Sequence, residues 1–120
     1  MKSLAPLLAF LALPFCALSA PSYDQSRVPL EVDAPKLGLT KIVLLAGGPS
    51  SKAMAHEYFA GCVLLMDWLK QQPGVWPVLA RDWPANERVL EGAKCVVYFG
   101  DGGGKQPFAT PARWAKLTQL

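Results

Sequence analysis

Residues 39–69 read LTKIVLLAGGPSSKAMAHEYFAGCVLLMDWL, and this stretch decides the fold class. It opens on a short unbroken apolar run from Ile42 to Leu45, which is typical of a parallel strand covered on both faces. After a Gly-Pro-Ser loop, apolar residues recur every three or four positions from about Ala53 to Gln71, which predicts an amphipathic helix. Open α/β sheets build ligand sites where a buried strand leads through such a loop into a helix.

The rest of the chain continues the alternation of strands and helices. Two further strands are predicted at 75–80 and 94–99, with a short helix at 85–91 and another from Thr110 to the chain end. Pro77 cannot donate to a ladder and therefore favours an edge position for the second strand. We expect an α/β fold with a parallel sheet in the order 2-1-3. Three strands do not make a complete domain of this kind, so the fold is predicted to be truncated after the third strand.

Residues 1–20 have the features of a secretory signal peptide. Lys2 gives a basic start, 4–18 is an apolar run, and a small-residue cleavage site follows. The run is short for a membrane span, which disfavours the alternative of an uncleaved anchor. We expect a secreted or periplasmic protein without a membrane span after cleavage. Residues 21–39 carry three prolines and are expected to form an extended linker, which leaves the domain proper at 40–120.

Charge and cysteine content disfavour several classes of function. Without the leader the chain carries eleven basic and nine acidic side chains, and they form no basic stripe, so nucleic acid is not an expected partner. Cys62 and Cys95 remain, too few for a disulfide framework. We expect two buried thiols, with a bridge between them as the alternative. The sequence has one histidine and no Cys-x-x-Cys motif, so we expect no metal site.

Two unusual loops follow the first and third strands. In a 2-1-3 sheet these strands are neighbours, and ligands bind beyond their carboxyl ends, where the winding direction reverses. The loops at 47–54 and 100–107 are therefore expected to face each other across one crevice. The candidate site residues in and beside these loops are Gly48, Ser50, Ser51, His56, Glu57, Asp101, Gly102 and Gly103.

Each candidate has a chemical role and a structural alternative. His56, the only histidine, is the candidate acid/base with Glu57 beside it, or else the two residues cap and stabilise a first helical turn. Asp101, which three glycines follow, is a candidate hydroxyl ligand, or else part of a flexible turn. The first loop is not a P-loop, because Lys52 precedes Ala53 where a serine or threonine should bind magnesium. The dinucleotide fingerprint G-x-G-x-x-G is also absent, and no cofactor is expected.

The stretch KIVLLAGGPSSKAMAHEYFAGC, followed by a strand that ends in YFGDGGG, resembles the ThuA-like proteins. This family is named for trehalose utilisation and is related in fold to class I glutamine amidotransferases. The resemblance covers the chain from about Lys41, the first half of the family domain, and implies a flavodoxin-like, three-layer sheet and a link to carbohydrate metabolism. This chain has Ser51 where close relatives tend to have a histidine, which weakens any role that needs two histidines.

The resulting expectation is an exported ThuA-like protein whose partner is a small molecule. It is expected to bind or process a carbohydrate in the crevice between the two loops. One alternative is a non-catalytic binding module with the same fold. The other is a hydrolase or amidotransferase-like enzyme whose nucleophile lies beyond Leu120, so the sequence leaves open whether the protein is an enzyme.

Overall fold

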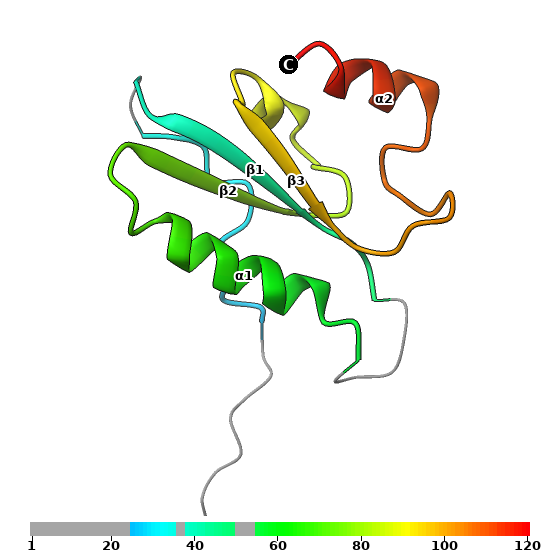
Figure 1. Cartoon of the computed structure of the whole chain (residues 1–120), viewed down its shortest axis with the longest axis horizontal. Helices are drawn as coiled ribbons and strands as arrows, with labels where there is room; N and C mark the ends of the chain where they lie inside the picture. The colour runs from blue at the N-terminus through cyan, green and yellow to red at the C-terminus, as the bar shows by residue number, and fades with distance from the viewer. Residues whose placement is uncertain (1–24, 36–37, 50–54) are drawn as a thin grey trace, which may run out of the picture.

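A computed structural model describes residues 25–35, 38–49 and 55–120 and is built around a parallel sheet in the order β2-β1-β3 (Figure 1). Its elements are β1 (Thr40–Ala46), α1 (Tyr58–Leu69), β2 (Val75–Arg81), the 3-10 helix η1 (Glu87–Leu90), β3 (Cys95–Phe99) and α2 (Pro111–Leu117). The predicted α/β class, parallel pairing and strand order are confirmed, and the arrangement is flavodoxin-like. Within the described ranges, no helix is long and apolar enough to cross a bilayer.

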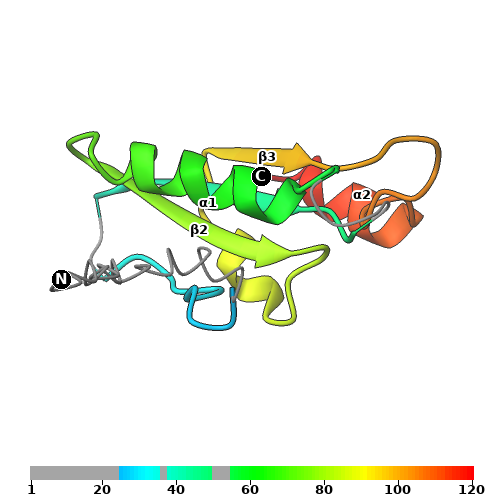
Figure 2. The ribbon, with the colours of Figure 1, turned by 90° about the horizontal axis from the view of Figure 1, so that it is seen from below.

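The sheet separates two small apolar cores, because successive side chains of a strand point to opposite faces. On one face Leu44 packs beneath α1 against Cys62. On the other face Val43 and Leu45 pack with Leu90 of η1, and α2 extends this layer (Figures 1 and 2). Burial of β1 on both faces explains why its sequence is apolar without alternation.

The two edges of the sheet differ. β2 forms one edge, as Pro77 predicted, and the segment before β1 runs alongside it. The Glu31 N–H donates to the Leu79 carbonyl at 2.8 Å, and the Trp76 indole Nε1 donates to the Val32 carbonyl at 3.0 Å. The predicted linker therefore contributes to the packed domain. β3 forms the opposite edge, and Figure 2 shows it along the outer margin of the sheet.

The predicted helix limits were wrong for both α-helices. α1 begins at Tyr58 rather than near Ala53, so His56 and Glu57 precede the helix instead of lying in its first turn. The φ angle of His56 is 57°, a left-handed conformation that cannot continue a right-handed helix. α2 ends at Leu117 instead of continuing to the end of the chain.

The two cysteines of the predicted domain are both free thiols. Cys62 lies on the buried face of α1, as predicted, and burial raises the pKa of its thiol. The prediction of a buried Cys95 was wrong, because this residue opens the edge strand β3 and is exposed. No bridge joins the two.

Candidate functional site

The carboxyl ends of β1 and β3 meet through two glycines. The Gly47 N–H donates to the Phe99 carbonyl at 2.8 Å. A Cβ built on Gly47 would lie only 2.9 Å from the Gly100 Cα, so a side chain at this position would push the two backbones apart. Glycine therefore lets the loop after β1 approach the loop after β3, as the strand order predicted.

Asp82 ties the end of β2 into the same region. Its N–H donates to the Ala46 carbonyl at 2.8 Å, and its carboxylate accepts a 2.7 Å hydrogen bond from the Gly48 N–H. The φ angle of Asp82 is 49°, in the left-handed region that aspartate tolerates better than most residues. Sequence reasoning did not single out Asp82, although an aspartate directly after a strand is a recognisable turn signal.

Three side chains converge on Asp101 at the start of the loop after β3. The Tyr58 hydroxyl donates a hydrogen bond to its Oδ1, and the His56 Nδ1 lies 3.8 Å from the same oxygen. The Tyr98 hydroxyl donates to the Asp101 carbonyl at 3.0 Å. His56 and Asp101 thus lie together as predicted from the facing loops, and two tyrosines that were not predicted hold the aspartate in place.

The surroundings favour the protonated form of one member of the cluster, Tyr98. Burial raises the pKa of Tyr98, and the charges of Asp82 and Asp101 and the neighbouring Tyr58 raise it further. Its hydroxyl therefore remains a donor at neutral pH. The left-handed φ of His56 is uncommon outside glycine, and such conformations concentrate at functional sites.

Two adjacent hollows of about 210 Å³ each flank the cluster and form one crevice. Gly48 and Pro49 line both of them. The charged side chains and the histidine that line the crevice are His56, Glu57, Arg81, Asp82, Asp101 and Lys105. The crevice therefore presents carboxylates, an imidazole and cations to one small volume.

The remaining predicted residues differ in their placement. Gly48 contributes its backbone N–H and lines the crevice. Gly102 and Gly103 do not line either hollow, and Gly103 adopts a φ of 72° in the loop after β3. Ser50 and Ser51 lie outside the described residues.

The arrangement suits hydrogen bonding and proton exchange. Histidine is the side chain that most often serves as an acid or base in enzymes, and the His56 Nδ1 lies 3.8 Å from the Asp101 Oδ1. In the part of the chain that the structure describes, no group of three or more histidine, cysteine, aspartate or glutamate side chains could hold a metal ion.

Comparisons with protein-family models, with curated proteins and with solved structures found no match to this chain. The resemblance to ThuA-like proteins therefore remains a prediction from the sequence. The geometry of the crevice is the basis for a functional proposal.

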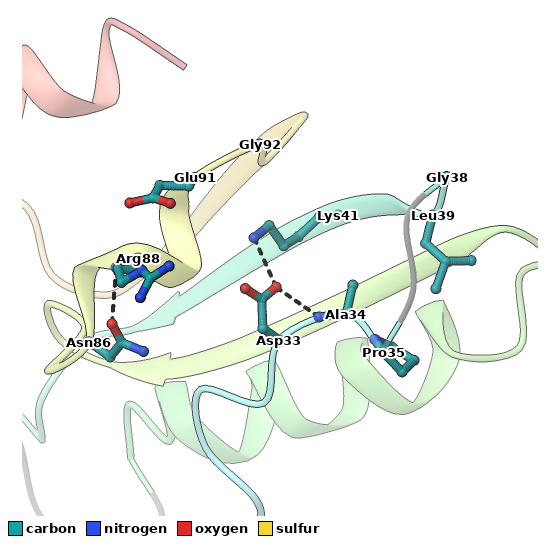
Figure 3. Close-up of a pocket in the computed structure, with 10 residues that line it drawn as sticks. All are labelled: Asp33, Ala34, Pro35, Gly38, Leu39, Lys41, Asn86, Arg88, Glu91 and Gly92. Atoms are coloured by element: carbon teal, nitrogen blue, oxygen red, sulfur yellow. Dashed lines mark hydrogen bonds and ion pairs between the residues drawn. The ribbon is translucent and has the colours of Figure 1, made fainter.

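A larger cavity of about 680 Å³ lies at the opposite, amino ends of the strands (Figure 3). The Lys41 ammonium meets the Asp33 carboxylate there at 2.9 Å, and Arg88 faces them from the other wall. The Lys41 side chain is only 9% exposed, and its hydrogen bond lowers the pKa of Asp33. This ion pair neutralises a nearly buried charge and fastens the segment before β1, so structural stability accounts for these residues.

Proposed function

We propose that the crevice at the carboxyl ends of β1 and β3 binds a carbohydrate. The observation that carries the proposal is the convergence of the Tyr58 hydroxyl and the His56 imidazole on the Asp101 carboxylate. Sugar hydroxyls both donate and accept hydrogen bonds, and carboxylates and imidazoles supply the complementary groups. Asp82 places a second carboxylate in the same crevice.

Within this proposal, Asp101 binds a sugar hydroxyl and His56 acts on it as an acid/base. The His56 side chain is 55% exposed and therefore accessible to a ligand from solvent. Its Nδ1 lies 3.8 Å from the Asp101 Oδ1, close enough for the imidazole and the carboxylate to contact the same sugar. Glu57 lines the same hollow and adds a further acceptor.

The resemblance of the sequence to ThuA-like proteins supports the choice of carbohydrate as the ligand class. The parallel sheet in the order β2-β1-β3 is the kind of fold that this resemblance implies. We also propose that the protein is exported, on the basis of the signal-peptide pattern at residues 1–20.

A binding assay with a panel of monosaccharides and disaccharides tests the site. We expect at least one sugar to bind, and Asp101→Asn to weaken its binding by roughly tenfold to a hundredfold, because it removes a charged hydrogen-bond acceptor. Asp33→Asn is the matched control, since it makes the same chemical change in the cavity at the amino ends. If Asp33→Asn loses sugar binding and Asp101→Asn does not, the sugar binds in the cavity at the amino ends and the proposal is wrong. The proposal is also wrong if no sugar binds to the wild-type protein.

A second candidate is a binding module without catalysis. The distance of 3.8 Å between the His56 Nδ1 and the Asp101 Oδ1 exceeds a hydrogen bond, so the pair is not arranged for direct proton transfer. His56→Gln separates the two candidates. Loss of turnover with retained sugar binding supports an acid/base role, whereas a wild-type protein that binds sugars without converting any of them supports the module.

Nucleophilic chemistry of the amidotransferase kind receives no support from the described cysteines. Cys62 is buried, and burial raises the pKa of its thiol, which disfavours the reactive thiolate. Cys95 lies at the start of β3, at the opposite end of that strand from the crevice. Neither thiol is placed to attack a ligand held by Asp101.

A further inference from the structure

Arg81 ends β2 and lines the same hollow of the crevice as His56. Side chains alternate along a strand, so Arg81 lies on the face of the sheet where Leu79 packs beneath α1. The central carbon of its guanidinium lies 3.6 Å from the centre of the Phe59 ring. Because Phe59 is buried in the core, this cation–π contact holds the guanidinium in one place beside the hollow.

The charge of Arg81 has no anionic partner among the described residues. The ion pairs in that part of the chain use other cations, namely Lys41, His56, Lys70 and Lys116. The Arg81 Nη2 donates to the Gln25 Oε1 at 3.5 Å, which is long for a hydrogen bond. A guanidinium carries five N–H donors in a planar fork, so most of them remain available to a ligand.

The carboxylates near Arg81 do not neutralise it. Asp82 is the next residue, but its carboxylate accepts the Gly48 N–H at 2.7 Å. Asp101 lines the adjoining hollow instead of the one that Arg81 lines. Glu57 lines the Arg81 hollow, but it forms no ion pair with Arg81 in the described part of the chain. An anion from outside the chain would therefore complete the pairing.

We propose that the carbohydrate bound in this crevice carries an anionic group, a carboxylate or a phosphate, and that Arg81 binds this group. The inference rests on the proposed function, because it names the class of sugar that the same crevice takes. The guanidinium fork matches two oxygens of either group with two parallel hydrogen bonds. In this arrangement the anionic group occupies the Arg81 hollow, and the sugar hydroxyls extend toward Asp101 in the adjoining hollow.

Lys105 is the second cation of the crevice and provides the matched control. It lines the adjoining hollow together with Asp82 and Asp101, and it also lacks an ion pair among the described residues. It differs from Arg81 in that no aromatic ring in the described chain holds its charge in place. A lysine ammonium is also a point charge and cannot bind two oxygens in a planar fork. We therefore assign the anionic group to Arg81.

Isothermal titration calorimetry of the full chain with matched sugars tests the assignment. The probes are the neutral hexoses glucose, galactose and mannose, the uronic acid of each, and the phosphate monoester of each at the terminal hydroxyl. Arg81→Gln removes the positive charge and the fork, whereas Lys105→Gln removes a positive charge from the adjoining hollow. Circular dichroism of both variants checks that the fold is retained.

We expect the wild type to bind the uronic acid or the phosphate monoester of a hexose at least roughly tenfold more tightly than the neutral hexose. The anionic series that binds more tightly identifies the carboxylate or the phosphate as the natural group. Arg81→Gln should abolish this preference and leave the affinity for the neutral hexose unchanged. Lys105→Gln should retain the preference.

Three results would each overturn the inference. These are equal affinities for neutral and anionic sugars, a preference that survives Arg81→Gln, and a preference that Lys105→Gln removes as completely as Arg81→Gln does. If neutral hexoses bind and Asp101→Asn weakens their binding, the proposed function remains even where this inference fails. If no sugar of any series binds, both are wrong.

Discussion

Replacing Gly47 with alanine tests the contact that holds the crevice together. The added Cβ would lie 2.9 Å from the Gly100 Cα and 3.1 Å from the Tyr98 hydroxyl oxygen. The first of these atoms belongs to the backbone and cannot rotate away, so the loop after β3 must shift. Such overpacking costs about 1–3 kcal/mol, whereas alanine in place of glycine gains about 0.4–1 kcal/mol by restricting the unfolded chain. We expect a net loss of about 1–2 kcal/mol in the free energy of unfolding.

Urea unfolding followed by circular dichroism measures this loss, and Gly102→Ala is the matched control. Gly102 has a φ outside the left-handed region, and a Cβ there would meet only the Gln106 Nε2, at 3.9 Å. The control should be neutral or more stable by about 0.4–1 kcal/mol. If Gly47→Ala is as stable as the wild type, the two backbones do not approach closely enough to require glycine, and the account of the crevice is refuted.

Three further changes test the packing and the ion pairs. Leu44→Ala removes a fully buried side chain from the core between the sheet and α1 and should cost about 3–5 kcal/mol in urea unfolding. Asp33→Asn leaves the nearly buried Lys41 ammonium without its carboxylate and, because Asp33 is half exposed, should cost only about 1 kcal/mol at neutral pH. The folded state lowers the Asp33 pKa below 3.8, so this stabilisation is present above that pH and disappears as pH falls through the folded pKa, where the wild type and the variant should converge. Glu87→Gln removes the negative charge that pairs with the Lys116 ammonium at 2.6 Å, so amides of α2 should exchange hydrogen faster than in the wild type.

Local sequence patterns were sufficient to predict the fold. The apolar run Ile42 to Leu45 lies in the central strand, Pro77 lies at an edge, and Cys62 lies on the buried face of α1. Each of these predictions depends on residues that are neighbours in the chain. The start of α1 could not be predicted in the same way. Residue spacing alone extends the helix upstream to about Ala53, but the left-handed backbone of His56 cannot be part of a right-handed helix.

The site was predictable only as far as strand order determines it. Parallel pairing of β1 with β3 places His56 near Asp101, and the sequence predicted this pairing. Tyr58 and Asp82 were missed because their roles depend on how the first turn of α1 and the end of β2 are oriented in space. The exposure of Cys95 was missed for a related reason, since burial of a strand depends on whether another element covers its edge.

The crevice depends on the position of β3. Phe99 accepts the hydrogen bond from Gly47, and its ring packs edge-on against Tyr58, with 5.1 Å between the ring centroids. Tyr58 in turn holds Asp101. Phe99 therefore links the close approach of β1 and β3 to the carboxylate that lines the crevice. Gly47→Ala should then weaken sugar binding as well as stability, whereas unchanged sugar affinity in this variant would show that Tyr58 and Asp101 are held independently of the contact between the two loops.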